Sequence, residues 1–514
     1  MNLSDLLTEN VARFGEYPLL HFKGKVITNR ELDRDVNRVA SGLKQMGVQP
    51  GDRVALIMGN SPELLTIMFA CFKLGAWAMP VVLSLRPPEL ALVLNDSEPS
   101  TLFSQRIFAD RIMEPVKETG SGINWRIMIG KGPALANWIP YEDWVEGKPT
   151  EFQARNCTPD DVALLLYTSG TTGNPKGVML SHLNLFSNAV NTAKSQGLRQ
   201  GEIILSVLPL NHSFGITAWL AALSFGMQVV LMPRFDPVEV IRGIDRHQVE
   251  SAAMVPTMLH FLLEVPERDR GTGLKSMQRI IVGAAPLRVG LRERFETTYP
   301  HIRILEAYGL TEASPGVTVT RPDRHVRPRS VGQSIESQEV QVVDELDRPL
   351  PPGAVGEVCT RGPHVMVGYF RRANETAEVL RGGWLHTGDA GYLDEDGYLY
   401  LTERLKDLII RGGENVYPSD VERVLSAHPA VVEAAVIGMP DEVYGEEVVA
   451  VVVKRADATV TEEELIRFCE ENLASFQVPK KFLFTHMLPK SPMGKIRKQD
   501  LREQFTGVVK SEGK

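Results

Sequence analysis

The sequence predicts an α/β protein: a large N-terminal domain of stacked α/β layers that carries a β-rich subdomain, followed by a small α+β C-terminal domain. The first observation is length, because 514 residues exceed what one hydrophobic core holds at roughly 100–200 residues per domain. The second is that short apolar runs alternate with helical patterns up to residue 305. The third is a change at about residue 331, where hairpin-like strands begin.

Helix starts are marked by capping residues. Thr28 and Glu31 form a capping-box pattern, and apolar residues follow them at helical spacing. Ser61-Pro62 and Asp236-Pro237 are also typical helix starts. The predicted helices run from residue 28 to 47, from 61 to 74, from 181 through 189, and from 236 to 247.

The apolar runs beside these helices predict buried strands. Strands of a parallel sheet are buried on both faces and therefore read as continuous hydrophobic runs. The runs are residues 54–58, 76–82, 203–208, 229–232, 251–255, 280–283 and 302–305. Their alternation with helices predicts parallel sheets with helices on their faces, and a site at the carboxyl ends of the strands.

The last part of the chain predicts a different mixture. Strands at 340–343 and 356–359 flank a Pro/Gly turn, and 391–393 with 398–400 predict a hairpin around Asp-Glu-Asp-Gly. In the tail, Ser419 and Thr461 are predicted to cap helices through pairs with Glu422 and Glu464. Strands are expected at 434–437 and 447–453.

Composition excludes several classes of protein. The net charge of −8 gives no sign of the concentrated basic face that nucleic acid requires. Four cysteines, Cys71, Cys157, Cys359 and Cys469, lack metal-type or redox-type spacing, which fits a reducing compartment. The N-terminus has no signal-peptide pattern, so a cytoplasmic location is expected. Residues 216–232 are uncharged but too short for a membrane span, and predict a buried helix followed by a strand.

The most informative segment is residues 164–178, Leu-Leu-Leu-Tyr-Thr-Ser-Gly-Thr-Thr-Gly-Asn-Pro-Lys-Gly-Val. It begins as an apolar strand and continues into a loop of hydroxyls and glycines with Lys176, after which Ser181 can cap a helix. Strand, glycine-rich loop and helix form an arrangement that binds phosphates through backbone N–H groups, hydroxyls and a cation. No Gly-Lys-Ser/Thr closes the loop, so it is not a Walker loop.

Five further motifs accompany this loop. The first three each follow a predicted strand, where the site of a parallel sheet is expected. The motifs are Leu-Pro-Leu-Asn-His-Ser-Phe-Gly at 208–215, Gly-Ala-Ala-Pro-Leu at 283–287, Tyr-Gly-Leu-Thr-Glu at 308–312, Thr-Gly-Asp at 387–389 and Pro-Lys-Ser-Pro-Met-Gly-Lys at 489–495.

Together the motifs resemble those of adenylate-forming acyl-CoA synthetases of the fatty-acid or aryl-acid type, in the superfamily that also holds peptide-synthetase adenylation domains and luciferases. The resemblance runs from about residue 10 to 505, and the phosphate loop fits nearly letter for letter. It implies an N-terminal adenylation domain at 1–404, with its β-rich subdomain at about 331–404, a hinge at 405–407 and a mobile C-terminal domain at 408–514.

The implied reaction has two halves. A carboxylate attacks the α-phosphate of MgATP and gives acyl-AMP and pyrophosphate; the thiol of coenzyme A then attacks the acyl carbonyl and releases AMP. Both reactants of the first half are anions, so positive charge and N–H dipoles must offset their repulsion and stabilise the charge that builds on phosphorus. ATP, Mg²⁺ and coenzyme A are therefore the expected ligands.

The resemblance also implies which residues bind the nucleotide. Thr311 bonds the α-phosphate, and Glu312 holds Mg²⁺ together with Thr168. Gly283 to Pro286 and Tyr308 enclose the adenine, with backbone contacts from Ala285 and Ala307. The implied nucleotide-binding set of the N-terminal domain is Thr168, Ser169, Gly170, Thr171, Thr172, Gly173, Lys176, Gly283, Ala284, Ala285, Pro286, Ala307, Tyr308 and Gly309.

Residues near the end of the chain complete the implied site. Asp389 bonds the ribose hydroxyls with help from Arg404, although alone it reads as a turn aspartate. Lys495 reaches the oxygens that join carboxylate and α-phosphate, although Lys490, Lys495, Arg497 and Lys498 also read as a solvated basic face. Lys406 is the implied pivot, and rotation about it presents Gly412 and Gly413 to the pantetheine of coenzyme A, where a simple turn is the alternative.

The substrate is read from the implied pocket. Residues 211–214 carry no acid, unlike amino-acid-activating relatives, so the substrate lacks an α-ammonium group. Residues 252–256 and 283–285 are small and apolar, which implies a hydrophobic acid, and they hold no arginine for a dicarboxylate. His212 is placed at the carboxylate and thiol end, with a core histidine as the alternative. The implied pocket is His212, Ser213, Phe214, Val255, Gly283, Ala284 and Gly309.

The expected function is therefore ATP-dependent acyl-CoA formation, with a medium- or long-chain fatty acid as substrate. An aryl-acid CoA ligase and an acyl-AMP ligase that loads a carrier protein are alternatives within the same enzyme class. A non-catalytic acyl or nucleotide sensor is the alternative from another class, which intact Lys176, Glu312, Asp389 and Lys495 disfavour. A kinase is disfavoured because AMP is the expected product. No transmembrane segment is expected, and a homodimer is left open.

Overall fold

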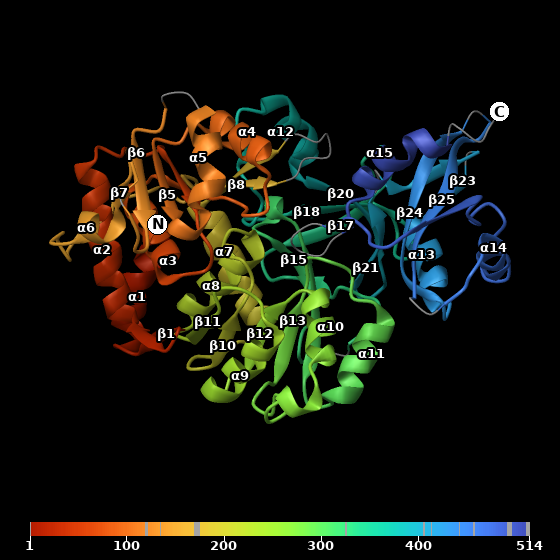
Figure 1. Cartoon of the computed structure of the whole chain (residues 1–514), viewed down its shortest axis with the longest axis horizontal. Coiled ribbons are helices and arrows are strands. Elements are labelled where there is room, and N and C mark those ends of the chain that lie inside the picture. Colours follow the sequence, from red (N-terminus) through yellow and green to blue (C-terminus); the bar gives the residue numbers. More distant parts are fainter. Residues whose placement is uncertain are drawn as a thin grey trace. The chain divides into compact units, whose positions relative to one another are not determined.

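The computed structural model describes residues 2–118, 122–133, 135–168, 175–323, 326–404, 407–412, 414–441, 443–455, 458–490 and 496–509. The chain, coloured by sequence in Figure 1, divides into two compact units. The first unit comprises Met1–Val340 and Thr360–Leu385, and the second comprises Gln341–Cys359 and His386–Lys514. The expected hinge at 405–407 stays a prediction, because Leu405 and Lys406 lie outside the described residues.

The first unit contains a nine-stranded sheet that is parallel in its centre. Its order is β16-β15-β14-β13-β12-β10-β11-β1-β2. The strands are β1 (Pro18–Phe22), β2 (Lys25–Thr28), β10 (Ile203–Ser206), β11 (Gln228–Leu231), β12 (Ser251–Met254), β13 (Arg279–Val282), β14 (Arg303–Gly309), β15 (Gly316–Val319) and β16 (Gln333–Ser334). The predicted parallel strands from residue 203 to 305 are confirmed by the pairings of β11, β10, β12, β13 and β14.

Three helices cover one face of this sheet. They are α9 (Pro237–His247), α10 (Pro256–Glu264) and α11 (Val289–Thr298), and Figure 1 shows them beside β12 and β13. Ile241, Leu259 and Phe295 from these helices join one buried cluster with Ala252 and Ile280 from the strands. The helix α9 begins as predicted, because Asp236 accepts hydrogen bonds from the backbone N–H groups of residues 238 and 239.

A second, eight-stranded sheet of the first unit has the order β19-β9-β8-β4-β3-β5-β6-β7. Its strands are β3 (Arg53–Ile57), β4 (Trp77–Pro80), β5 (Thr101–Gln105), β6 (Trp125–Ile129), β7 (Ile139–Pro140), β8 (Val162–Thr168), β9 (Lys176–Ser181) and β19 (Gly368–Tyr369). Helices α4 (Pro87–Ser97) and α5 (Ala109–Glu118) pack on one face through a cluster that includes Leu94, Ile112 and Leu102.

Helices also connect the two sheets. Helix α7 (His182–Ser195) contacts β9 of one sheet, α8 (Ser213–Ser224) contacts β10 and β11 of the other, and the two helices contact each other. Asn60 adds a polar link, because its side chain donates to the carbonyl groups of Leu208 and Met232. The remaining helices are α1 (Asp5–Phe14), α2 (Asn29–Gln45), α3 (Pro62–Leu74), α6 (Tyr141–Val145) and α12 (Ala373–Val379). These layers confirm the predicted fold class.

Local predictions in this unit hold where the residues that decide them are close in sequence. Thr28 and Glu31 form the expected capping box of α2, and Ser61 caps α3. The uncharged segment at 216–232 is part of α8 followed by β11. No helix among the described residues is long and apolar enough to cross a bilayer.

The second unit contains a four-stranded sheet with the order β17-β18-β20-β21. Its strands are β17 (Glu339–Val343), β18 (Gly356–Arg361), β20 (Leu385–Leu393) and β21 (Leu399–Arg404). The predicted hairpin is confirmed, because β20 pairs with β21 in antiparallel fashion around the turn at 394–398.

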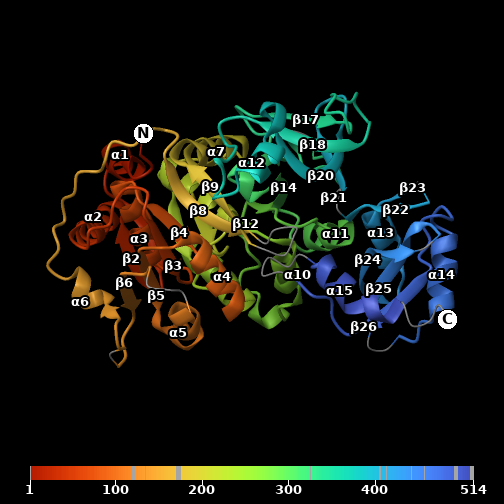
Figure 2. The same cartoon turned by 90° about the horizontal axis from the view of Figure 1, so that it is seen from above.

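A five-stranded sheet follows, formed by β22 (Ile409–Arg411), β23 (Glu414–Val416), β24 (Val431–Asp441), β25 (Gly445–Lys454) and β26 (Lys481–Thr485). Successive side chains along each strand point to opposite faces of this sheet, as the pleat requires. Val436 and Val452 pack against α13 (Pro418–Ala427) and α14 (Glu462–Glu470), whereas Ile437 and Val451 pack against α15 (Lys498–Val509). Figure 2 shows these helices around β24 and β25.

One predicted cap in this unit is wrong. Thr461 caps α14 as expected, through a hydrogen bond from the N–H of Glu464. Helix α13, however, begins one residue before Ser419, and its N-cap Tyr417 makes no side-chain cap. The hydroxyl of Ser419 instead donates to the carbonyl of Thr402 at 2.6 Å, so a tertiary contact takes the group that a cap would use.

Candidate active site

The phosphate-loop segment differs from the predicted strand, loop and helix. Its two ends are the antiparallel strands β8 and β9, in which Thr168 lies opposite Lys176, so the segment is a hairpin. Helix α7 starts only after β9, with Ser181 as the predicted cap. Ser169, Gly170, Thr171, Thr172 and Gly173 lie outside the described residues. The hairpin places the hydroxyl-bearing Thr168 and the cationic Lys176 at the two ends of one loop.

Two side chains hold the ammonium group of Lys176. Its Nζ forms an ion pair with Glu375 of α12 and lies 5.2 Å from the ring centroid of Tyr369. Strand β19 brings this tyrosine there, because Tyr369 pairs with Val178 of β9. The N–H of Tyr369 in turn donates to Thr376 on α12. These two contacts define the direction of the lysine side chain.

The same tyrosine contacts the acidic residue of the Thr-Glu motif. Tyr369 Oη donates to Glu312 Oε1 at 2.9 Å, and the carbonyl of Glu312 accepts from the N–H of Met366. Among the described residues, Oε2 of Glu312 has no hydrogen-bond or ion-pair partner. A carboxylate oxygen of this kind, with the hydroxyl of Thr168, is the hard oxygen ligand that Mg²⁺ prefers. Glu312 therefore fits the expected metal.

Thr311 and Ser213 come from different strand ends and meet in the interior. Thr311 begins the short helix η3 (Thr311–Ala313) after β14, and its Oγ1 lies 3.3 Å from Ser213 Oγ. Ser213 is the first residue of α8, and Thr217 of that helix donates to the carbonyl of Ser314. Both hydroxyls are buried, and together they offer hydrogen-bond donors beside a helix N-terminus.

His212 is the N-cap of α8. Its Nδ1 accepts from the N–H of Phe214 at 3.3 Å, so this nitrogen is unprotonated in the capping arrangement. Burial lowers the pKa of His212 to about 4, because a charged imidazolium is poorly solvated there. A neutral imidazole at this position adds no charge at neutral pH. The alternatives of a core histidine and a substrate-contacting histidine share this protonation state.

The Gly-Ala-Ala-Pro motif and Phe214 lie side by side. A Cβ on Gly283 would lie 2.9 Å from the carbonyl oxygen of Ala307 and 3.4 Å from the Phe214 ring, so the position has room only for glycine. The parallel pairing of Val282 with Glu306 brings the motif next to Tyr308. Ala284 has a left-handed backbone with φ of 67°. This register agrees with the expectation that the motif and Tyr308 enclose the adenine ring.

The remaining predicted pocket residues come from two strand ends. Val255 follows β12, is the N-cap of α10 and is buried. Gly309 ends β14, and a Cβ there would collide with the carbonyl of Pro315. Ala285 is half-buried, whereas Pro286 is exposed. The described pocket residues carry no side-chain charge, which agrees with the expected hydrophobic acid.

The second unit carries the predicted ribose and pantetheine residues. Asp389 is buried and pairs in register with Arg404 across β20 and β21, and its N–H donates to Thr387. Gly412 has φ of 60°, and its N–H donates to the carbonyl of Tyr444. Lys406, Gly413 and Lys495 lie outside the described residues.

The other cations of the predicted basic cluster are paired. Lys490 bonds Glu433 at 2.9 Å, Lys498 bonds Glu422 at 3.0 Å and Arg497 bonds Asp500 at 3.2 Å. Three of the four cations are thus bound by carboxylates of their own unit. These carboxylates offset the charge of the three cations, of which Lys490 and Arg497 remain partly exposed.

Sequence reasoning missed Tyr369 and Glu375. Tyr369 lies on a strand of two residues, which is too short to give a periodic pattern. Glu375 lies in the short helix α12, where an acidic residue normally reads as solvated surface. The Gly-Tyr pair at 368–369 is a signal, but a weak one without the position of β9 beside it.

Fold and site together define an enzyme that binds a nucleotide at loops of stacked α/β sheets. Comparison with known proteins gives the family. The model of the AMP-binding enzyme family matches residues 7–370, and that of its C-terminal domain matches residues 420–495. The chain belongs to the AMP-binding enzyme family, and within it to the AMP-forming acid–thiol ligases, the class of acyl-CoA and aryl-CoA synthetases.

Relatives with different substrates align over nearly the whole chain. A feruloyl-CoA synthase of Amycolatopsis sp is 38% identical, covering 94% of each chain. A fatty acid–[acyl-carrier-protein] ligase, ScoC, of Streptomyces coeruleorubidus is 37% identical, covering 95% of this chain and 94% of the relative. A long-chain-fatty-acid–CoA ligase of Escherichia coli O6:H1 is 33% identical, covering 99% of this chain and 95% of the relative.

Among solved structures, ATP-bound MatB from Rhodopseudomonas palustris matches with a TM-score of 0.90 at 32% identity, covering 99% of this chain and 100% of that chain. The anthranilate CoA ligase AuaEII in complex with anthranoyl-AMP also matches with a TM-score of 0.90, at 26% identity, covering 99% of this chain and 98% of that chain. These likenesses confirm the expected fold and the expected enzyme class.

Proposed function

We propose that this chain converts a medium- or long-chain fatty acid, ATP and coenzyme A into acyl-CoA, AMP and pyrophosphate through an acyl-adenylate. The observation that carries the proposal is the arrangement around Tyr369. This one side chain contacts the cation Lys176 on its ring and the carboxylate of Glu312 through its hydroxyl. This arrangement supports the proposal, because phosphoryl chemistry on MgATP needs a phosphate-binding cation and a metal-binding carboxylate close to each other.

The nucleotide-binding residues of the N-terminal domain have separate roles in adenylation. Lys176, with the hydroxyls and backbone of residues 168–173, binds the β- and γ-phosphates. Glu312, with Thr168, holds Mg²⁺, which offsets the negative charge of the phosphates. Thr311 donates to the α-phosphate where charge builds during attack, and Ser213 Oγ at 3.3 Å orients that hydroxyl. The adenine lies against Gly283 to Pro286, Ala307 and Tyr308.

The second unit supplies the remaining groups. Asp389, with Arg404 opposite it, binds the ribose hydroxyls. Lys495 neutralises the carboxylate and the α-phosphate as they join. Rotation about Lys406 then presents Gly412 and Gly413 to the pantetheine arm, where absence of a side chain lets backbone approach a thin ligand.

Hydrophobic character of the pocket supports a fatty acid. Val255, Phe214 and Gly283 are uncharged, and His212 is neutral because burial lowers its pKa to about 4. An acid with a second carboxylate or an ammonium group would therefore be buried without a partner, which costs several kcal/mol. The E. coli long-chain ligase is a relative that agrees with the proposal, whereas the feruloyl-CoA synthase and ScoC define its two alternatives.

Acid-dependent release of pyrophosphate and AMP tests the proposal. The panel contains straight-chain acids from C2 to C18, benzoates and cinnamates, each with and without coenzyme A. We expect the highest kcat/KM among the C8 to C18 acids, with acyl-CoA as product. A maximum on cinnamates would identify an aryl-acid ligase. Acyl transfer only to a carrier protein would identify the acyl-carrier-protein alternative, and release of ADP would refute the reaction.

A further inference from the structure

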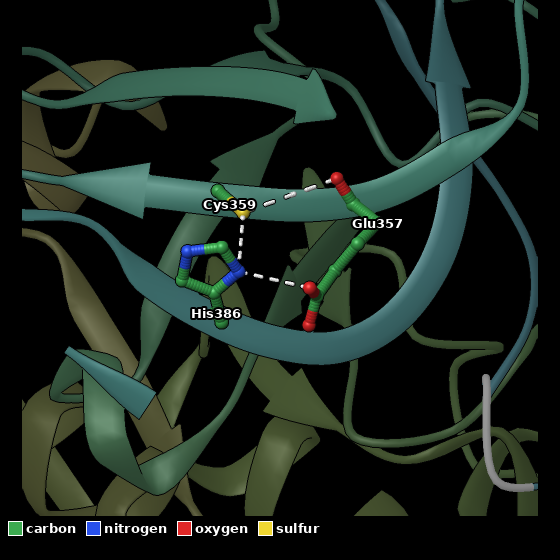
Figure 3. Close-up of side chains that lie close together, drawn as sticks. All are labelled: Glu357, Cys359 and His386. Atoms are coloured by element: carbon green, nitrogen blue, oxygen red, sulfur yellow. Dashed lines mark hydrogen bonds and ion pairs between the residues drawn. The ribbon is translucent and has the colours of Figure 1, made fainter. Parts of the chain in front are cut away.

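A second cluster of reactive side chains lies in the four-stranded sheet and contains none of the residues given a role above. Glu357 and Cys359 lie on β18, two residues apart and therefore on the same face, and His386 lies on the neighbouring strand β20. Figure 3 shows the carboxylate, the thiol and the imidazole pointing toward one another. His386 is 27 residues from Cys359 in the chain, so the pairing of the two strands brings the cluster together.

The distances place three metal-binding atoms in one small volume. His386 Nδ1 lies 2.8 Å from Glu357 Oε2 and 3.3 Å from Cys359 Sγ. One ligand atom from each residue lies within 4.8 Å of the other two. The thiol is fully buried and His386 is 8% exposed, so water competes little for either group. A second carboxylate, Asp347, has its Oδ1 3.9 Å from the same imidazole nitrogen and is exposed to solvent.

The sulfur, nitrogen and oxygen atoms of this cluster indicate which metal ion it would bind. Thiolate, imidazole and carboxylate are the ligands of Zn²⁺, whereas Mg²⁺ and Ca²⁺ take oxygen atoms. In a tetrahedral zinc site, bond lengths of about 2.0 to 2.3 Å put a sulfur and a nitrogen about 3.6 Å apart and a nitrogen and an oxygen about 3.4 Å apart. The observed separations of 3.3 and 2.8 Å are shorter by only a few tenths of an ångström. A small rotation of the side chains would therefore admit the ion.

We propose that Glu357, Cys359 and His386 form a binding site for one thiophilic divalent cation of the Zn²⁺ type, with Asp347 or water as the fourth ligand. Binding releases the thiol proton of Cys359 to solvent and leaves the imidazole proton on Nε2. Glu357 can take part while it keeps its hydrogen bond to Gly388. Its Oε1 accepts from the N–H of Gly388 at 3.0 Å, while Oε2 faces the imidazole and can bind the ion.

This site is separate from the one expected for Mg²⁺. Glu312 offers hard oxygen in the first unit, whereas the Cys359 cluster offers sulfur and nitrogen and lies wholly in the second unit. Gly388 links the cluster to the neighbouring Asp389, so an ion would stiffen the segment that precedes the proposed ribose-binding residue. The binding itself is independent of the proposed function and can be measured without nucleotide.

The test uses the full chain, stripped of metal by a chelator and free of nucleotide. Co²⁺ is titrated as a spectroscopic probe in the presence of excess Mg²⁺, which occupies hard oxygen sites. We expect one Co²⁺ per chain, a sulfur-to-cobalt charge-transfer band and the visible bands of tetrahedral cobalt. Zn²⁺ should displace the probe and raise the Tm of the chain, because it binds the folded state alone.

Cys359→Ser should abolish the charge-transfer band and weaken binding at least about 100-fold, since even partners outside the coordination shell cost about 10–100-fold. His386→Gln is the second variant, in case the serine variant does not fold, and should weaken binding to a similar degree while the protein keeps its circular dichroism. Cys469→Ser, a buried cysteine in another core of the same unit, is the matched control and should keep the band. No band in the parent, or a band that survives in Cys359→Ser, would overturn the site and leave a hydrogen-bonded cluster.

Discussion

Tyr369 donates a hydrogen bond of 2.9 Å from its hydroxyl to the carboxylate of Glu312. Its ring lies 5.2 Å from the ammonium of Lys176, so one side chain contacts both a cation and an anion of the expected site. Because Glu312 and Lys176 are expected to contact the metal and the phosphates, Tyr369 is a positioning residue for both. This relationship gives the first prediction.

Tyr369→Phe should keep the ring under Lys176 and remove only the hydrogen bond to Glu312. A hydrogen bond to a charged group contributes about 1.5–3 kcal/mol, so we expect kcat/KM for MgATP in pyrophosphate release to fall roughly 10-fold or more. The dependence on Mg²⁺ concentration should shift as well, because the carboxylate loses its orientation. Tyr17→Phe is the matched control, since it also removes a hydrogen-bonded hydroxyl, the one that accepts from Asn10. Equal activity of both variants would contradict the positioning role.

Glu375→Gln should make MgATP bind more tightly. The carboxylate forms an ion pair with Lys176 and thereby competes with the phosphates for the ammonium. Partly exposed ion pairs contribute about 0.2–1 kcal/mol, so KM for MgATP should fall by roughly 1.4-fold to fivefold in initial-rate measurements. Glu378→Gln, an exposed acid on the same helix, should leave KM unchanged. A rise of KM in Glu375→Gln would instead show that the acid helps to place the lysine for binding.

Lys495→Ala should separate the two half-reactions. Loss of one charge-stabilising donor costs about 10²–10³ in rate, so acid-dependent pyrophosphate release should fall at least that far. Thioester formation from supplied acyl-AMP should persist, because the proposed rotation removes Lys495 from the site before coenzyme A reacts. Lys490→Ala is the control, since Lys490 is paired with Glu433. Equal loss in both half-reactions would contradict the rotation.

Acid should destabilise the chain through its buried histidines. Burial lowers the pKa of His182 to about 4, and its Nδ1 accepts from the N–H of Leu3, so the folded state holds it neutral. Below the unfolded value of about 6.5 the unfolded chain binds a proton that the folded chain does not. The stabilisation is therefore complete above pH 6.5 and is lost as the pH falls toward 4.

His182→Asn keeps an acceptor for Leu3 and removes the titrating group. Between pH 7 and pH 5 the free energy of unfolding by urea should fall by roughly 1–2 kcal/mol less in this variant than in the parent. His260→Asn, at an exposed histidine, serves as the control and should follow the parent. An unchanged pH slope in His182→Asn would show that this imidazole does not carry the linkage.

Much of the fold could be read from the sequence, and so could the positions of the site loops. The caps at Thr28, Ser61 and Asp236 follow from residues that lie within three positions of one another, and the structure confirms them. The hairpin form of the phosphate loop was not predicted, because Lys176 and the residues after it read equally well as loop or strand. The helix cap predicted at Ser419 is wrong for a related reason, since the hydroxyl of Ser419 donates to the carbonyl of Thr402, which is distant in sequence.

The sequence by itself determined the class of fold, the positions of many helices and strands along the chain and the motifs that mark an adenylate-forming enzyme, because propensity, capping and periodicity act over a few neighbouring residues. Only the tertiary structure decided that Tyr369 and Glu375 contact Lys176, and that the side chains of Glu357, Cys359 and His386 lie close together. These contacts depend on pairing between strands that are far apart in the chain, such as β9 with β19. The physical reason is that the free energy of such pairings comes from the burial and register of whole sheets, which no local pattern records.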